Sequence, residues 1–389
     1  MAGATVLFLP YPSTSGSWGS VMNLVALAQE CRSRGDRAVF NACPPTAELL
    51  RRQGFEVLPV EGARPRETPR AVDTFYDVCT ALGFDDRAFW ERVLRSEEEA
   101  VNAVRPDALV SHMRLTAPIS AARHGIPLAS CGGWSTDPRV QASGTHPLDE
   151  MAGQFASAWS ELTVRSISEL VFWRADLRMV TSVPIFEPDF ADLPNAVYTG
   201  YLRPMTDAEP PWSRPVPDRL VLAYASNAPW GVPRVVEALA TAAERAGAVL
   251  WCVARAGGPT GRVSEHCEVF SYLPFEALMA RAGAVVFHGG QATALASLCH
   301  GVPALAVPGR HYERRYNATR LAELGTSVTG DLAVLRPSRL AAILQRLLDD
   351  DDIRSAAASA HRSTYEHGGV VPTVDAIHRL IGSSSRGYR

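Results

Sequence analysis

The chain has 389 residues, a length typical of two or more domains. Hydrophobic residues make up 47% of it and charged residues 20%, which favours folded domains with full-sized cores and excludes wholesale disorder. A formal net charge of −3 at pH 7 argues against nucleic acid as the main partner, because binding a phosphate backbone needs a basic surface.

The seven cysteines are scattered and never form a C-x-x-C pair, which predicts reduced thiols and neither a disulfide framework nor a zinc site. The apolar run at residues 6–9 is too short for a signal peptide. No apolar stretch approaches the ~18 residues that a membrane span needs. We therefore expect a cytoplasmic protein without a membrane span or a metal site.

The chain opens with a strand, a Gly-rich turn, a helix and a second strand. Residues 5–9 predict a short apolar strand, and residues 13–20 predict a loop rich in Gly and Ser. Apolar side chains then recur on one helical face between residues 21 and 28, and residues 38–40 predict the next strand. This order is typical of a doubly wound parallel sheet.

The strand and helix pattern recurs along the rest of the chain. In the first half it predicts a strand at 107–110, a helix at 117–124 and a strand at 127–130. In the second half it predicts a strand at 220–224, a helix at 232–245, a strand at 249–253, a strand–helix unit at 284–299 and a further strand at 304–307. Both halves are therefore predicted to be Rossmann-like, and such domains bind ligands at the carboxyl ends of their strands.

Proline is concentrated between the two halves, which predicts a linker there. The predicted parts are an N-terminal domain at 1–202, the linker at 203–218, a second domain at 219–371 and a C-terminal helix and tail at 372–389 that packs back on the first domain. Residues 340–348 predict an amphipathic helix. The acids at 349–352 precede another helix, and we interpret them as partners of its N-terminal dipole and not as a metal cluster.

The most informative segment begins with the apolar strand at 284–287. His288 follows it, Gly289 and Gly290 predict a tight turn, and a helix then begins. The glycines let backbone N–H groups approach a ligand, and the helix N-terminus favours an anion. Because His288 and Thr293 flank the turn and can donate hydrogen bonds, the segment predicts a site for a diphosphate leaving group.

This His-Gly-Gly-x-x-Thr motif is followed by Gly301, Val302 and Pro303. Together they resemble the donor motif of nucleotide-sugar-dependent glycosyltransferases of GT-B fold, the UDP/TDP-glycosyltransferase family, in its branch of plant secondary-metabolite and bacterial antibiotic enzymes. The resemblance covers nearly the whole chain, strongly in the second half and loosely in the first. It implies an α/β GT-B fold, with two doubly wound Rossmann-like domains facing a cleft.

The resemblance assigns a part of the donor to each residue of the motif. His288, Gly289 and Gly290 would meet the α-phosphate, and Thr293 the β-phosphate. Ser226, just after the strand at 220–224, matches the family's small hydroxyl residue that also holds the diphosphate.

Further positions in the second half match donor contacts of the family. Tyr272 stands where the family often has a Trp that stacks on the base, although core packing would also explain it. Glu313 and Arg314, ahead of Asn317, occupy the place of an acid–Gln pair that binds sugar hydroxyls. Arg in place of Gln is a departure that would alter sugar choice or pair with a charged substituent. A surface salt bridge to Arg310 or Arg315 is the alternative for Glu313.

The first half departs from the family at the general base. The family's base is usually a His after a Gly in the loop before the first helix, and here Gly19 is followed by Ser20, a poor base. The family often supports that His with an Asp at the end of a later strand, and here His112 stands there. Our hypothesis is that His112 is the base, because its pKa suits proton abstraction near neutrality. Alternatively, His112 only binds the acceptor or the backbone, and another group, or an acidic acceptor, makes a strong base unnecessary.

The resemblance implies an inverting, metal-independent hexosyltransferase without a cofactor. Its partners would be a UDP- or dTDP-sugar donor and a small natural-product acceptor of secondary metabolism; the sequence indicates no oligomeric state. Two alternatives stay open: a catalytically silent auxiliary protein for a partner glycosyltransferase, and a nucleotide-sugar epimerase. Aromatic residues fall where an acceptor pocket is expected, and we expect two or three of them to touch it: Phe75, Tyr76, Phe84, Phe89, Trp90, Trp134, Trp159 and Trp173.

Overall fold

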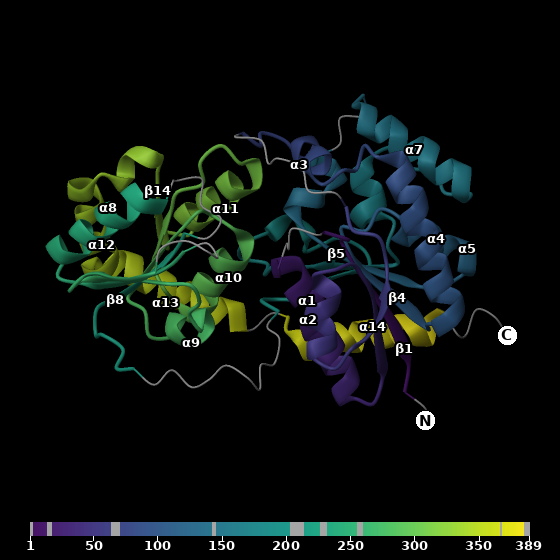
Figure 1. The fold of residues 1–389 in the computed structure, drawn as a ribbon, viewed down its shortest axis with the longest axis horizontal. Coiled ribbons are helices and arrows are strands. Elements are labelled where there is room, and N and C mark those ends of the chain that lie inside the picture. The colour runs from purple at the N-terminus through teal and green to yellow at the C-terminus, as the bar shows by residue number, and fades with distance from the viewer. Residues whose placement is uncertain are drawn as a thin grey trace. The chain divides into compact units, whose positions relative to one another are not determined.

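The computed structural model describes residues 3–13, 18–63, 71–141, 145–202, 214–225, 232–254, 260–365 and 368–384. The chain divides into two compact units, each an α/β layer structure with its own sheet (Figure 1). The first unit comprises Met1–Pro69, Thr74–Met205 and His367–Arg389, and the second comprises Arg70–Asp73 and Thr206–Glu366. Most of the linker predicted at 203–218 lies outside the described residues.

The first unit contains a seven-stranded sheet with the order β3-β2-β1-β4-β5-β6-β7, and all its neighbouring strands are parallel. Its strands are β1 (Thr5–Pro10), β2 (Arg37–Ala42), β3 (Glu56–Pro59), β4 (Ala108–His112), β5 (Leu128–Gly132), β6 (Leu177–Val180) and β7 (Ala196–Tyr198). Its α-helices are α1 (Trp18–Ser33), α2 (Thr46–Arg52), α3 (Phe75–Ala81), α4 (Arg87–Val104), α5 (Ala117–His124), α6 (Pro138–Gln141), α7 (Pro147–Trp159) and α14 (Val370–Ser384). Short 3-10 turns at Trp134–Thr136 and Pro188–Phe190 and a π-helical turn at Glu169–Trp173 complete it.

The second unit also contains a seven-stranded sheet, with the order β10-β11-β9-β8-β12-β13-β14. Its strands are β8 (Leu220–Tyr224), β9 (Val249–Val253), β10 (Gly261–Ser264), β11 (Cys267–Phe270), β12 (Ala284–Phe287), β13 (Ala304–Ala306) and β14 (Ser327–Thr329). Its helices are α8 (Val232–Arg245), α9 (Phe275–Met279), α10 (Gln291–His300), α11 (Tyr312–Glu323), the 3-10 turn Leu332–Leu335, α12 (Pro337–Asp349) and α13 (Asp351–Tyr365). The pairs are parallel except β10 with β11.

Each sheet reverses its strand order once, as in a doubly wound fold. The reversal lies between β1 and β4 in the first unit and between β8 and β12 in the second. In the first, Pro10 at the end of β1 is in register with His112 at the end of β4. Ligands of such sheets bind outside the carboxyl ends of the strands at this point. The fold therefore directs attention to the residues that follow β1, β4, β8 and β12.

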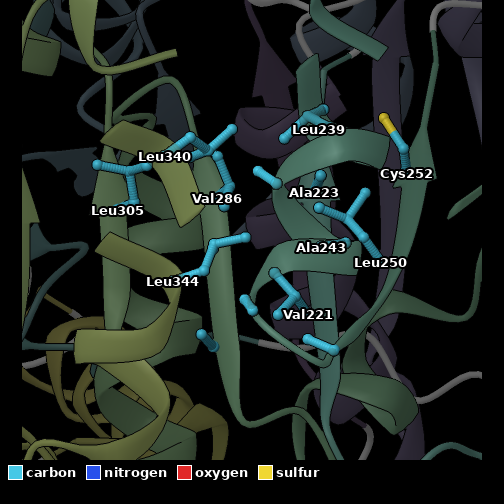
Figure 2. Packing of buried hydrophobic residues seen from close by; sticks show 14 of the residues in the cluster. Val221, Ala223, Leu239, Ala243, Leu250, Cys252, Val286, Leu305, Leu340 and Leu344 are labelled. Atoms are coloured by element: carbon cyan, nitrogen blue, oxygen red, sulfur yellow. The ribbon is translucent and has the colours of Figure 1, made fainter. Parts of the chain in front are cut away.

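The core of the second unit forms where α8 and α12 cover one face of the sheet (Figure 2). The central strands β8 and β12 are buried on both faces, so they are continuous apolar runs with no polar alternation. The helices contribute one apolar stripe each, at helical spacing. The labelled members of this cluster are Val221, Ala223, Leu250, Cys252, Val286 and Leu305 from the strands and Leu239, Ala243, Leu340 and Leu344 from the helices.

In the first unit α1 and α14 lie on one face of the sheet, while α4 and α5 lie on the other. The last helix thus returns to the unit in which the chain begins. Val374 and Ile377 are buried in the same cluster as α1, and Arg34 bonds to Asp375 at 2.5 Å. His378 Nε2 also lies 2.7 Å from an Asp36 carboxylate oxygen. The helix begins at Val370, two residues before the expected boundary at 372.

The predicted strand at 220–224 and the helix at 232–245 are confirmed at both ends, as is the strand at 249–253. The interpretation of the acids at 349–352 is also confirmed. Asp350 accepts hydrogen bonds from the backbone N–H groups of Asp352 and Ile353 at the start of α13. Among the described residues, no helix is long and apolar enough to cross a membrane.

A fully buried ion pair fastens the carboxyl edge of the first sheet. Arg114 Nε donates to Glu97 Oε2 at 2.8 Å, and neither side chain is exposed. The same guanidinium donates to the Pro10 carbonyl at 3.0 Å and to the Asn41 side chain, so it joins the ends of β1 and β2. It stands two residues after His112, and Met113 between them has a left-handed backbone with φ of 53°.

We predict that Arg114→Ala lowers the free energy of unfolding by about 3–5 kcal/mol, because it leaves the Glu97 carboxylate buried without its partner. Arg37→Ala is the control, since it breaks an exposed pair with Glu56 at 2.8 Å and should cost at most about 1 kcal/mol. Urea unfolding measures both variants. Equal losses would mean that the buried pair has no special weight.

Candidate active site

The candidate phosphate-binding loop follows β12 in the second unit. His288 comes directly after the strand, and Gly290 is the N-cap residue of α10. Glycine has no side chain with which to cap the helix, so the N-cap residue itself leaves the positive end of the α10 dipole open to an anion. This is the arrangement that the sequence predicts for an anion site.

Gly289 is the one residue of the loop whose backbone requires glycine on two grounds. Its φ is +85°, in the left-handed region, and a Cβ atom there would lie 2.7 Å from the Arg314 carbonyl oxygen. Asn317, which is 1% exposed, donates from Nδ2 to the Gly289 carbonyl at 2.9 Å. The loop is thereby fastened to α11, which begins at Tyr312.

Glu313 and Arg314 lie in the first turn of α11, both partly buried. Burial raises the pKa of Glu313, against the opposing effects of the Arg314 charge and a hydrogen bond with the Asn317 side chain. Burial also lowers the pKa of Arg314, and the negative charge of Glu313 acts in the opposite direction. Arg310 and Arg315 pair with Asp73, and not with Glu313 as the salt-bridge alternative required.

His288 is only 7% exposed, and burial lowers its pKa to about 3. The positive charges of Arg314 and His311 act in the same direction, while a hydrogen bond to the backbone of Tyr224 opposes them. Nδ1 is buried and has no hydrogen-bond partner, so the bond to Tyr224 uses Nε2. The ring is therefore neutral near pH 7, with Nδ1 unprotonated. An anion at Nδ1 would favour its protonation.

The remaining donor-site predictions are spread over the second unit. Thr293 lies in the first turn of α10 and is partly buried. Tyr272 is 61% exposed, which excludes the core-packing alternative and leaves base stacking as a prediction. Ser226 lies outside the described residues, one position after the last described residue of the β8 end.

In the first unit the structure brings His112 and Ser20 together. His112 is the last residue of β4, and Ser20 lies in the first turn of α1. Burial lowers the pKa of His112 to about 4, opposed by a hydrogen bond with the backbone of Ser20, so the expectation of a pKa near neutrality was wrong. Nδ1 of His112 is buried and has no hydrogen-bond partner, so this bond also uses Nε2. A hydrogen bond that raises a histidine pKa ends on an acceptor, so the ring donates to the Ser20 carbonyl.

The aromatic residues expected at an acceptor pocket fall into two groups. Trp134, Trp159 and Trp173 are partly buried. Phe75, Tyr76, Phe84, Phe89 and Trp90 are buried core residues. Among the described residues, no group of three or more His, Cys, Asp or Glu side chains is placed to hold a metal ion.

Two neighbours of the donor loop were missed in the sequence. His311 influences His288 electrostatically, and its own Nδ1 is buried without a hydrogen-bond partner. Val72, from the first half of the chain, forms a β-bridge with His311. The position of His311 two residues before Glu313 is a sequence signal that could have identified it as a neighbour of the donor loop. Nothing in the local sequence around residue 72 indicates a partner more than two hundred residues away.

The sequence is similar to those of known glycosyltransferases. Residues 236–369 match the family described as Erythromycin biosynthesis protein CIII-like, C-terminal domain. The elloramycin glycosyltransferase ElmGT of Streptomyces olivaceus is 28% identical over 297 residues, 69% of this chain and 70% of that protein. A demethyllactenocin mycarosyltransferase of Streptomyces fradiae is 30% identical over 131 residues, 33% of this chain and 28% of the relative's length.

Solved structures share the fold over nearly the whole chain. The glycotransferase of kitacinnamycin has a TM-score of 0.78 at 21% identity and covers 97% of this chain and 98% of its own. The glycosyltransferase VinC, in complex with dTDP, has a TM-score of 0.75 at 18% identity. The match covers 97% of this chain and 100% of the VinC chain. The chain has the GT-B fold, and the proteins to which it is similar are glycosyltransferases.

In this glycosyltransferase, the region that matches the family domain contains the described donor-site predictions, from Tyr272 to Asn317. It does not contain Ser20 or His112, which lie in the part of the chain where the resemblance is loose. The departures from the family pattern at positions 20 and 112 therefore lie outside the matched domain.

We predict that Gly289→Ala weakens binding of a nucleoside diphosphate by about tenfold or more, because strain of ~1–3 kcal/mol and the contact with Arg314 displace the loop. Gly247→Ala is a matched control, since Gly247 has a φ of +60° but no atom within 4 Å of the added Cβ. It should cost stability and leave affinity unchanged. Calorimetric titration of both variants measures the difference, and an unchanged affinity in Gly289→Ala would contradict the assignment of the loop.

Proposed function

We propose that this glycosyltransferase transfers a sugar, with inversion and without a metal ion, from a nucleoside-diphosphate sugar to a small natural-product acceptor. The observation that carries the proposal is the loop at the start of α10, where two glycines, a buried histidine and a helix N-terminus with glycine as its N-cap residue meet. Such a loop suits a diphosphate, whose negative charge increases as the glycosidic bond breaks.

Thymidine diphosphate is our first choice of nucleotide. VinC is in complex with dTDP, and the spinosyn rhamnosyltransferase SpnG is complexed with thymidine diphosphate. Both proteins share this fold, with TM-scores of 0.75 and 0.69. UDP is the alternative, because a stacking residue such as Tyr272 contacts the face of either pyrimidine.

The acceptor is proposed from the same relatives and from the chemistry of His112. ElmGT is an elloramycin glycosyltransferase, and SpnG is also complexed with spinosyn aglycone. The low pKa of His112 makes it a weak base, and a weak base is best matched to an acidic hydroxyl. We therefore propose a natural product that presents an acidic hydroxyl such as a phenol, whose pKa is about 10.

In the proposed reaction the acceptor oxygen attacks the anomeric carbon and the bond to the β-phosphate oxygen breaks. The α10 N-terminus stabilises the departing diphosphate, and His288, which takes up a proton from solvent on Nδ1 when the anionic donor binds, donates a hydrogen bond to it. His112 takes the acceptor proton on Nδ1, because Nε2 already donates to the Ser20 carbonyl. One displacement gives a product with inverted anomeric configuration.

We predict that wild type binds dTDP more tightly than UDP or GDP in excess EDTA, with a dissociation constant in the micromolar range. His288→Ala should lose roughly 1.5–3 kcal/mol of binding free energy, as expected for a charge-assisted contact. Calorimetric titration measures the affinity of wild type and of His288→Ala for each nucleotide. Binding to no nucleotide would remove the donor-site assignment, and a turnover lost in EDTA and restored by manganese would contradict metal independence.

The same titration has a pH readout. Because the pKa of free His288 is lowered to about 3, a bound diphosphate that protonates the ring takes up a proton. Affinity should therefore rise as pH is lowered from about 8 to about 6. The His288→Ala variant should lack that part of the pH dependence.

We predict that His112→Ala lowers turnover by about 10²–10⁴ without weakening nucleotide binding. The base acts in its deprotonated form and its pKa is lowered to about 4, so wild-type turnover should be level near neutrality and fall as pH falls through about 4. Steady-state kinetics across pH measure both effects.

His112→Gln is the matched variant, because a glutamine amide can still donate to the Ser20 carbonyl but cannot take the proton. Loss of turnover in both variants supports the base. Full turnover in His112→Gln would mean that the side chain only positions the loop of Ser20.

The other two functions are separated by incubating the protein with a dTDP-sugar and no acceptor. Slow hydrolysis agrees with a transferase, whereas an epimeric sugar would indicate an epimerase. Binding without any turnover, even with a range of acceptors, would indicate an auxiliary protein.

A further inference from the structure

Four residues of the first half of the chain belong structurally to the second unit. The division into units assigns Arg70–Asp73 to the second unit and Thr74 to the first. Residues 71–73, the described part of this segment, are here called the strap. No role in donor binding follows from the donor motif for residues at this place in the chain.

The strap is held by backbone hydrogen bonds next to α11. The Val72 N–H donates to the Arg310 carbonyl at 2.8 Å, and the Tyr312 N–H donates to the Val72 carbonyl at 2.8 Å. Together they form a parallel bridge between Val72 and His311. Val72 is 3% exposed, so its side chain is buried as well.

These bonds make the strap an external cap of α11. The first N–H groups of a helix have no partner within the helix, and a side chain of the N-cap residue usually supplies one. Here the N-cap residue His311 makes no such side-chain bond, and the Val72 carbonyl accepts the N–H of Tyr312, the first helical residue.

Asp73 adds charge to the same cap. Its carboxylate oxygens lie 2.6 Å from Arg310 Nη2 and 3.3 Å from Arg315 Nη2, on either side of the helix start. A negative charge near a helix N-terminus is favourable, because it opposes the positive end of the dipole. The backbone of Val72 and the side chain of Asp73 therefore both contact the first turn of α11 and Arg310, two residues before it.

That turn carries the residues predicted to meet the donor sugar. Glu313 and Arg314 lie in the first turn of α11, and Asn317 one turn later holds the Gly289 carbonyl. We propose that the strap is a positioning element for sugar recognition, which orders Glu313 and Arg314 toward the sugar of the donor. This inference rests on the proposed function of the site.

The test compares dTDP with dTDP-glucose (UDP and UDP-glucose if wild type binds UDP) by calorimetry on the full chain. Asp73→Asn removes the charge, and we expect about two- to fivefold weaker binding of the nucleotide sugar, as for an exposed ion pair. Val72→Pro removes the N–H that bonds to the Arg310 carbonyl, and we expect the nucleotide sugar to bind about tenfold more weakly. Binding of the nucleotide alone should not change in either variant, and Asp73→Glu should restore most of the loss.

Asp349→Asn is the control, because it breaks a comparably exposed pair with Arg219 elsewhere in the same unit. Its affinity for both ligands should equal that of wild type. Unchanged nucleotide-sugar binding in both strap variants would overturn the inference, as would an equal loss for nucleotide and nucleotide sugar. If wild type binds nucleotide and not nucleotide sugar, the proposed function fails and the inference fails with it.

Discussion

The hydrogen bond from Asn317 to the Gly289 carbonyl is the interaction on which the donor half of the protein depends. It connects the loop after β12 with α11, two segments that the sheet alone would not hold in register. The approach is close, because an added Cβ on Gly289 would meet the Arg314 carbonyl. The positive φ of Gly289, the buried amide of Asn317 and the position of Arg314 are therefore one constraint. Loss of the Asn317 bond or of the positive φ at Gly289 would therefore displace groups predicted to meet phosphate as well as those predicted to meet sugar.

The two halves of the chain place a histidine in equivalent surroundings. His112 ends β4 and His288 follows β12, and each of these strands lies beside the reversal of strand order in its sheet. In both rings burial lowers the pKa, one nitrogen bonds to a backbone group and Nδ1 is buried without a hydrogen-bond partner. Both rings are neutral with an unprotonated Nδ1. In the proposed function this state lets His112 accept a proton and lets His288 take up a proton when it contacts phosphate.

The sequence predicts the features that are local. The strand at 220–224 and the helix at 232–245 follow from periodicity within short windows, and the loop from His288 to Gly290 is contiguous. Side-chain exposure is harder, since Tyr272 is aromatic but lies mostly in solvent. The bridge between Val72 and His311 and the buried pair of Arg114 and Glu97 join distant segments. Tertiary packing determines which residues pair in these contacts, and no local sequence pattern predicts it.

The exchange at the position of the base has a physical consequence of its own. A serine at position 20 cannot act as a base, but its backbone carbonyl still accepts a hydrogen bond from His112. That bond occupies Nε2 and so assigns the lone pair to Nδ1, which a freely rotating imidazole would not do. Burial keeps the ring neutral at the expense of its basicity, so under the proposed function the site would favour acceptors that release a proton easily over stronger nucleophiles that hold it. Under the proposed function, the departure of the first half from the family pattern thus bears on which acceptors are used, while the donor loop keeps the residues of the family motif.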